Sequence, residues 1–260
     1  MISKNILSSS EGVICEMSGH SKWANIKHRK GKMDAIRGKL TTKIGREITI
    51  AVKMGGSDPI GNTRLKLALQ KAKANNVPKD NIQRAIQKGQ GALDGSSYEE
   101  ITYEGYGPSG VAVMVTTLTD NRNRTAADVR HLFSKYGGNL GETGCVGWMF
   151  QRKGLFVVEK ISNVDEDDLL MLVLDNGAED MKAEEDSFEI FTQPEDFDQV
   201  EKALADNNID VASAEIAMIP DTMIALTGDA AVKMEKMLES LEDLDDVQDV
   251  FSNAELPGEE

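Results

Sequence analysis

Apolar residues recur at helical spacing between residues 35 and 89, in three pieces separated by glycine and proline. The breaks fall at Gly55-Gly56, Asp58-Pro59 and Val77-Pro78. In the first piece an arc of about 100° is apolar and the opposite side is basic. The apolar arc holds Ile44, Ile48, Ala51 and Val52, and the basic side holds Lys43, Arg46 and Lys53. This pattern predicts a small basic helical bundle.

A small, polar and non-periodic segment at 89–97 follows and has the composition of a linker. Beyond it, the apolar pattern predicts strands at 101–106, 111–118 and 148–152 and a helix at 125–136. Residues 155–219 predict the order strand, helix, strand, strand, helix, strand, which is that of a ferredoxin-like domain. The remainder predicts a strand at 222–226, a helix at 230–241 and a strand at 247–251.

Together these elements predict an α+β protein with an N-terminal basic helical bundle followed by two α/β ferredoxin-like domains, one inserted in the other. The late strand, helix and strand are expected to complete a domain begun by strand 111–118. The expected boundaries are a disordered leader at 1–16, a basic helical domain at 17–95, an α/β domain at 96–153 plus 220–260, and an inserted domain at 154–219. The leader has one Lys, no Arg and no long apolar core, so it fits neither a secretory signal nor a transit peptide, and Met17 is the expected start.

The chain has neither a membrane-spanning pattern nor a cysteine framework. Its longest aliphatic run, from Leu169 to Leu174, has six residues, whereas a membrane helix needs about 20. Cys15 and Cys145 are its two cysteines and form no C-x-x-C pair, which favours a reducing compartment and opposes a zinc module. We therefore expect a cytoplasmic protein with no membrane partner.

Charge is distributed very unevenly along the chain. The net charge of −15 combines a segment at 17–90, with 17 Lys or Arg against four acids, and a segment at 161–260, with four bases against 30 acids. Such asymmetry is typical of a segment that binds a polyanion joined to an acidic body. Like charge near phosphate repels it, so we expect the acidic part to face away from the polyanion.

The basic segment 19–32 carries the strongest sign of function. It holds Lys and Arg around one tryptophan with little apolar periodicity, which predicts an extended arm. Such cations neutralise phosphates, and an indole stacks on an unpaired base. The alternatives are a solvated basic tail and a tryptophan buried against the bundle. The residues are Lys22, Trp23, Lys27, Arg29, Lys30 and Lys32.

A second candidate is the segment 119–125, which places Arg122 and Arg124 in a predicted loop before a helix. Guanidinium groups and backbone N–H groups in such a loop hold phosphate well. In the alternative, the neighbouring Asp120 and Asn121 form the turn and the arginines pair with the acidic body. The pattern leaves both open.

No catalytic or cofactor motif emerges. The chain lacks G-x-S-x-G, H-E-x-x-H and both common nucleotide-binding glycine motifs. The acidic run at 165–168 departs from a calcium loop and reads as a helix start. We expect no cofactor, no metal, no small-molecule substrate and no enzyme activity; an enzyme with a carboxylate-rich interdomain cleft is the remote alternative.

Several strings resemble the YebC family. In the basic part these are Gly19-His20-Ser21-Lys22-Trp23, Arg46-Glu47-Ile48, Asp58-Pro59 and Asn76-Val77-Pro78-Lys79-Asp80-Asn81-Ile82. Further along they are Tyr103-Glu104-Gly105-Tyr106-Gly107-Pro108, residues 119–125 and the Gly137-Gly138 to Gly141 stretch. The similarity implies a three-domain protein, helical first and then α/β, that binds nucleic acid without a known catalytic step. It covers bacterial transcriptional regulators and mitochondrial translational activators for cytochrome oxidase.

We therefore predict a nucleic-acid-binding regulator of gene expression, first a DNA-binding transcriptional regulator. The alternative is a ribosome-associated factor that contacts ribosomal RNA or tRNA and eases stalls at proline-rich stretches. No recognition helix is identifiable, and phosphate contacts from an arm suit RNA slightly better. Besides the arm, the phosphate-binding residues are expected to be Arg37, Lys39, Lys43 and Arg46.

Overall fold

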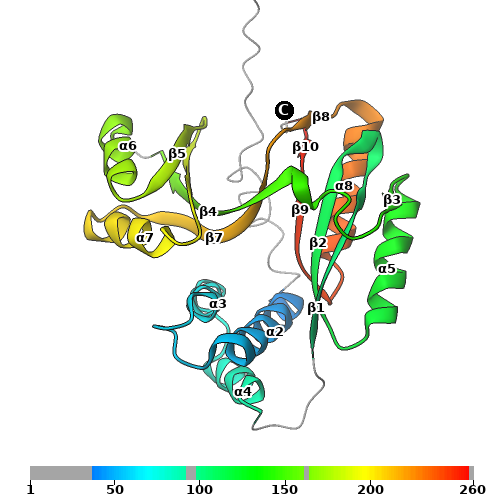
Figure 1. Ribbon diagram of the computed structural model, residues 1–260, viewed down its shortest axis with the longest axis horizontal. Helices are drawn as coiled ribbons and strands as arrows, with labels where there is room; N and C mark the ends of the chain where they lie inside the picture. Colours follow the sequence, from blue (N-terminus) through cyan, green and yellow to red (C-terminus); the bar gives the residue numbers. More distant parts are fainter. Residues whose placement is uncertain (1–36, 92–97, 161–163, 258–260) are drawn as a thin grey trace, which may run out of the picture.

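The computed structural model describes residues 37–91, 98–160 and 164–257, which pack into three main hydrophobic cores (Figure 1). One core lies among three helices, and each of the other two combines a four-stranded sheet with two helices. The chain is therefore a mixed α+β protein, as predicted. The predicted leader and residues 92–97 of the predicted linker lie outside the described residues.

The first core joins α2 (Arg37–Gly55), α3 (Thr63–Ala74) and α4 (Lys79–Gly89). The predicted apolar arc of α2 is buried, and Ile48 packs in one cluster with Leu65 of α3. Asn62 fixes the turn between these helices, because its side chain accepts from the Leu65 N–H at 3.0 Å and donates to the Ala51 carbonyl at 2.8 Å. Gly89 lets α4 approach α2 closely, since a Cβ there would lie 2.6 Å from the Thr49 carbonyl oxygen.

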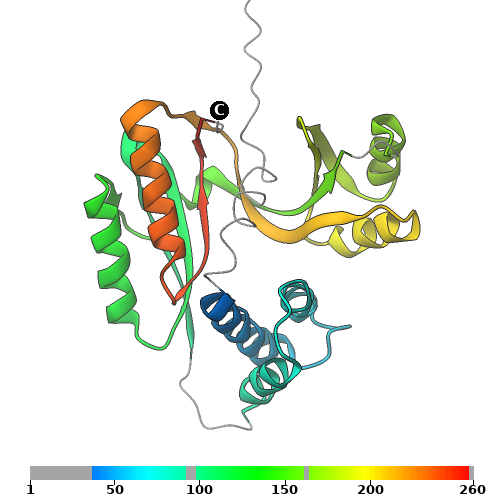
Figure 2. The ribbon, with the colours of Figure 1, turned by 180° about the vertical axis from the view of Figure 1, so that it is seen from behind.

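The second core lies under the sheet β3-β1-β2-β9, whose pairs are antiparallel. Its strands are β1 (Glu99–Tyr106), β2 (Ala112–Thr119), β3 (Asn139–Leu140) and β9 (Val247–Ser252). The helices α5 (Arg122–Lys135) and α8 (Gly228–Glu242) cover one face, which Figure 2 shows from the helix side. Alternate residues of β2, such as Val113, pack in one cluster with Phe133 and Met234.

The third core lies under the sheet β5-β6-β4-β7, also antiparallel. In chain order its elements are β4 (Phe150–Glu159), α6 (Glu166–Asp175), β5 (Ala178–Ala183), β6 (Ser187–Thr192), α7 (Phe197–Asp206) and β7 (Val211–Pro220). This is the order that the apolar pattern predicts for residues 155–219. The rings of Phe156 and Phe197 stack in the core with centroids 4.4 Å apart.

Two strand predictions are wrong. The segments 148–152 and 155–160 form one strand, β4, because its pairing with β7 continues from Phe150 to Val158; the predicted domain boundary at 153/154 therefore falls inside β4. The strand at 222–226 shortens to β8 (Ile224–Ala225) and pairs in parallel with β10 (Ala254–Glu255), outside the four-stranded sheets. The neighbours of β2 in its sheet are β9 and β1, and the eight residues of β1 pair with β2 along their full length.

The hydropathy of the described helices stays below that of a membrane span. Among the residues that the structure describes, no helix combines the length and the apolar character needed to cross a bilayer.

Candidate nucleic-acid interface

The predicted phosphate-binding residues divide into those outside and those inside the described part of the chain. The arm residues lie outside it: Lys22, Trp23, Lys27, Arg29, Lys30 and Lys32. Arg37 is the first residue of α2. The five others stand on two helices, with Lys39, Lys43 and Arg46 on α2 and Arg122 and Arg124 on α5.

Two lysines of α2 contact the carboxyl end of α8. Lys39 Nζ donates to the Asp243 carbonyl oxygen at 3.2 Å, and Lys43 Nζ donates to that of Glu242. Carbonyl groups at the end of a helix lack intrahelical donors and carry partial negative charge, so these lysines cap α8. Burial lowers the pKa of Lys43, although the neighbouring carboxylates favour its charged form.

Asp246, in the turn after α8, joins three segments of the chain. Its carboxylate accepts from Arg46 at 2.8 Å, from Arg124 at 2.7 Å, from Thr125 at 2.7 Å and from Thr119 at 3.2 Å. Burial alone would raise the pKa of Asp246, but the bonds from Arg124 and Thr125 and the two guanidinium charges lower it. The result is a buried ionised carboxylate that holds α2 and α5 against the turn.

The predicted loop at 119–125 is largely helix. Asn121 caps α5 by accepting from the Arg124 N–H at 3.2 Å, so the helix begins at Arg122. Arg124 pairs with Asp120 at 2.9 Å as well as with Asp246, and these bonds raise its pKa. Arg124 therefore follows the alternative in which the arginine pairs with the protein's own acids, whereas the Arg122 side chain is exposed.

Cations of α3 are also held by carboxylates. Lys66 bonds Asp198 at 2.8 Å and Glu201 at 2.6 Å on α7. Burial by itself would lower the pKa of Lys66, but the bonds to the two carboxylates outweigh burial and raise the pKa above its ordinary value. Arg64 likewise bonds Glu47 at 2.6 Å. Most of the described basic residues on α2 and α3 therefore hold the fold together.

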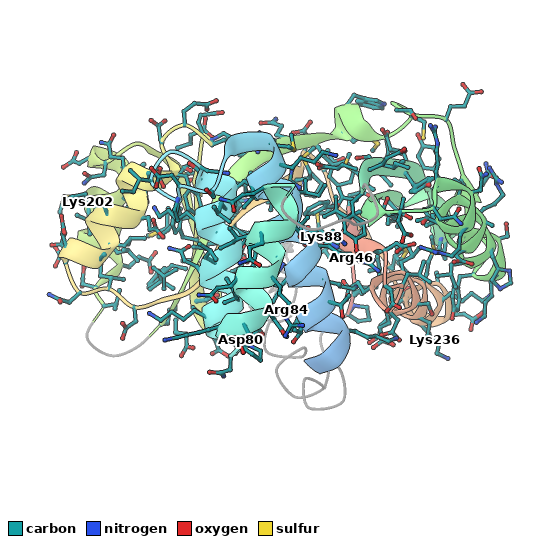
Figure 3. The ribbon with its side chains drawn as sticks, turned by 90° about the horizontal axis from the view of Figure 1, so that it is seen from below. Arg46, Asp80, Arg84, Lys88, Lys202 and Lys236 are labelled. Carbon is teal, nitrogen blue, oxygen red and sulfur yellow. The ribbon has the colours of Figure 1, made fainter. Side chains whose placement is uncertain are left out.

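Helix α4 differs, because carboxylates do not hold its cations. Lys79 and Arg84 are exposed and Lys88 is half-buried, and within the described ranges no ion pair joins any of the three to a carboxylate. The helix carries a single acid, Asp80. Figure 3 shows Asp80, Arg84 and Lys88 in line along α4, with Arg46 of α2 beside Lys88.

A groove of about 290 Å³ runs between α2 and α4. Three of its lining residues are cations, Arg46, Arg84 and Lys88, and no carboxylate side chain is among those described as lining it. Lys88 Nζ lies 4.5 Å from the centre of the Tyr98 ring and 3.3 Å from its hydroxyl oxygen. The other lining residues are small or polar: Thr42, Gly45, Thr49 and Ala85.

The sequence interpretation missed Arg84 and Lys88. Their spacing of four residues places both on one side of α4, while Ala85 is buried in the bundle core. That amphipathic spacing was the signal that could have identified them. The number of basic residues in the segment favoured α2, but Lys39, Lys43 and Arg46 of that helix bond to the end of α8 and the turn after it.

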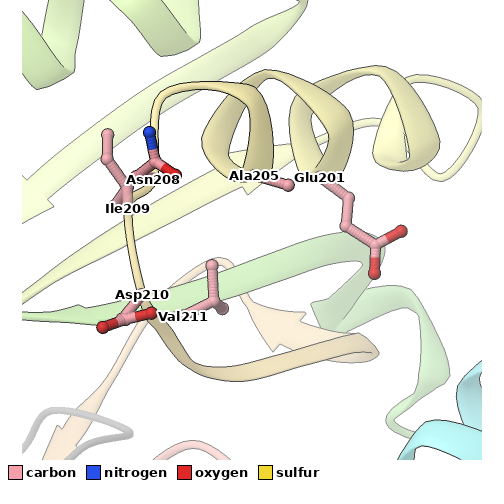
Figure 4. Close-up of a pocket in the computed structure, with 6 residues that line it drawn as sticks. All are labelled: Glu201, Ala205, Asn208, Ile209, Asp210 and Val211. Carbon is pink, nitrogen blue, oxygen red and sulfur yellow. The ribbon is translucent and has the colours of Figure 1, made fainter.

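A second hollow, of about 390 Å³, lies beside α7 and is shown in Figure 4. Figure 4 places Glu201 and Asp210 at opposite ends of it, so their carboxylates do not converge. Glu201 already accepts from Lys66 and Gln70. In the part of the chain that the structure describes, no group of three or more His, Cys, Asp or Glu is placed to hold a metal ion.

Comparison with known proteins matches almost the whole chain. Residues 21–92 match a family model described as the TACO1/YebC protein N-terminal domain, and residues 98–254 match one described as the TACO1/YebC second and third domain. A relative from Clostridium tetani, named probable transcriptional regulatory protein, is 57% identical over 243 residues, which cover 94% of this chain and 99% of the relative.

Two further comparisons agree. A protein of the same name from Pelotomaculum thermopropionicum is 57% identical over 241 residues, covering 92% of this chain and 99% of that protein. The crystal structure of a conserved hypothetical protein from Aquifex aeolicus aligns with a TM-score of 0.82 at 47% identity, covering 92% of this chain and 98% of that one.

Proposed function

The chain belongs to the TACO1/YebC family, and on that premise we propose that it is a DNA-binding regulator of gene expression. The curated relatives are named probable transcriptional regulatory proteins, and we propose the same role for this chain. Its contact with DNA is made by the cations of α4, which pair with no described carboxylate, together with the basic segment that precedes α2. The acidic body stays away from the phosphates.

One observation supports this proposal above the others: α4 carries three cations, Lys79, Arg84 and Lys88, and its single acidic residue is Asp80. Figure 1 places α4 at the lower edge of the molecule, beyond α2 and away from the sheet of β4 and β7. Cations on such an open edge remain available to phosphate oxygens, whereas those of α2 already have partners. Phosphate neutralisation supplies most of the affinity of non-specific DNA binding and steers association.

The domain arrangement is part of the proposal. The three cores support a basic helical domain that includes α2 to α4, an α/β domain at 96–153 plus 220–260 and an inserted domain at 154–219. The boundary at 153/154 lies within β4, whose Phe150 packs with Ala112 of β2 and whose Phe156 packs in the core of the inserted domain. The strand order β5-β6-β4-β7 supports a ferredoxin-like inserted domain. We place the protein in the cytoplasm and assign it no catalytic step.

The proposal predicts DNA binding that weakens steeply with salt. Each neutralised phosphate contributes a slope of about −0.9 to log K against log salt, so three contacts alone weaken binding about 40-fold between roughly 50 and 200 mM salt. The measurement is gel retardation of a pool of promoter fragments against scrambled DNA of equal length and composition.

Sedimentation with ribosomes in gradients is the companion measurement. We expect the chain to remain with DNA and to prefer promoter fragments over scrambled ones. A flat salt dependence, or co-sedimentation with ribosomes without retardation of DNA, would reject the proposed function.

A further inference from the structure

The groove between α2 and α4 is a shallow, open hollow at which three cations meet. Arg84 and Lys88 line it from α4, and Arg46 lines it from α2. Its remaining lining residues carry no charge. Lysines and arginines on an open helix face contact phosphates separately, whereas cations that converge on one hollow act together on a single anion.

Arg46 is held rigidly at this groove. Its Nη1 atom donates to the Asp245 carbonyl oxygen at 2.6 Å and to Asp246 Oδ1 at 2.8 Å, and its side chain is only 15% exposed. Its guanidinium carbon also lies 5.4 Å from the centre of the Tyr98 ring. A guanidinium fixed in this way loses little side-chain entropy when a ligand arrives.

The Arg46 Nε atom is buried and lacks a hydrogen-bond partner among the described residues. Buried N–H groups of a charged side chain are nearly always satisfied, and leaving one without an acceptor is unfavourable. An atom buried inside the protein is out of reach of a ligand in the groove. Arg46 therefore contributes its positive charge, held in a fixed position beside Lys88, rather than a hydrogen bond from Nε.

We propose that the α2–α4 groove binds one phosphodiester group of the nucleic acid, with Arg84 and Lys88 neutralising its charge and the fixed guanidinium of Arg46 adding positive potential. This inference rests on the proposed function and deepens it, because it assigns the phosphate to a particular site. The proposed function supplies a phosphodiester as the anion, and a lining with three cations and no carboxylate side chain attracts it.

The sharpest test fills the groove without changing any charge. Gly45 lines the groove in the interior of α2, and a Cβ built on it meets nothing within 4 Å. Leucine is a far better helix former than glycine, so Gly45→Leu keeps the helix. Gly38→Leu is the matched control, because Gly38 is on the same helix, has equal space and does not line the groove.

Fluorescence anisotropy with a labelled DNA oligonucleotide measures both variants, and circular dichroism confirms that they are folded. We expect Gly45→Leu to weaken binding about tenfold, as the loss of a charge-assisted contact does, and Gly38→Leu to leave it within about twofold. Equal DNA binding by Gly45→Leu and the wild-type chain would overturn the proposal that the groove binds a phosphodiester. Equal competition by poly-glutamate and by unlabelled DNA would overturn it too.

A second test counts phosphates. The double variant R84Q/K88Q is compared with K202Q/K236Q, which removes the same charge at two exposed sites that Figure 3 shows on either side of the helical part. If Arg84 and Lys88 share one phosphate, the salt slope falls by about 0.9; if they contact two phosphates separately, it falls by about 1.8. The control is expected to leave the slope unchanged.

A fall of the salt slope by about 1.8, or an unchanged slope, would overturn the proposed phosphate site in the groove while leaving DNA binding itself intact. Failure of the wild-type chain to bind any nucleic acid would instead reject both the proposed function and the phosphate site. The two failures are therefore distinguishable in one series.

Discussion

Replacing Asp246 with alanine should lower the free energy of unfolding by about 3 kcal/mol, the typical result of removing one partner from a buried ion pair. Asp246 is 7% exposed, and its carboxylate bonds the side chains of Arg46, Arg124, Thr119 and Thr125. Alanine leaves the mostly buried guanidinium of Arg46 without its carboxylate. Urea unfolding followed by circular dichroism measures the loss.

The matched control is Asp245→Ala. Asp245 is the preceding residue, and its side chain is exposed. It accepts a hydrogen bond from Arg46 through its backbone carbonyl oxygen, which is still present in alanine. We expect the control to stay within about 0.5 kcal/mol of the wild-type chain. Equal stability of the two variants would show that the carboxylate of Asp246 does not hold the segments together.

The same carboxylate should make the fold sensitive to acid. Because the folded pKa of Asp246 is lowered, its stabilising effect is complete above the unfolded pKa near 3.9 and is lost as the pH falls through the lower folded value. The stability difference between the wild-type chain and Asp246→Asn should therefore shrink as the pH falls below about 4.

Replacing Glu104 with glutamine should lower the free energy of unfolding by about 2 kcal/mol. The Glu104 carboxylate is buried under the loop before β4 and accepts from the N–H groups of Gly144 at 2.8 Å, Val146 at 2.9 Å and Gly147 at 2.7 Å. Burial alone would raise its pKa, but these three bonds lower it. The amide NH₂ of glutamine is a donor and would face some of these donors in place of an acceptor.

Hydrogen exchange reports this change directly, because the amides of Gly144, Val146 and Gly147 are expected to lose protection. Glu99→Gln is the control, since Glu99 is on the same strand and exposed. Unchanged exchange of the three amides in Glu104→Gln would contradict the role assigned to this carboxylate.

Local patterns in the sequence predicted most elements because local physics determines them. The burial of Ile44 and Ile48 follows from their shared helix face, and the start of α4 follows from Pro78 and Asp80. The local pattern failed to predict strand bounds where these depend on pairing with segments that are distant in the sequence. The break expected between residues 152 and 155 does not occur, because both neighbouring strands hold Gly154 in the ladder, and β8 is short because it pairs only with the two residues of β10.

The candidate site shows the same limit. The sequence placed Lys43 and Arg46 opposite the apolar face of α2, and in the structure both point away from the bundle core. It did not show that the end of α8 would cover them, since their partners are about 200 residues away. A count of charges along a segment cannot separate cations that have partners from those that face solvent.

One paired comparison tests whether the cations of α2 stabilise the fold while those of α4 bind DNA. In the same buffer, K39Q/K43Q and R84Q/K88Q are each measured for DNA affinity by anisotropy and for stability by urea unfolding. We expect K39Q/K43Q to unfold at lower urea with nearly unchanged affinity, and R84Q/K88Q to bind at least about tenfold more weakly at unchanged stability. The reverse pattern, with affinity lost in K39Q/K43Q and retained in R84Q/K88Q, would show that the cations of α2 rather than those of α4 bind DNA.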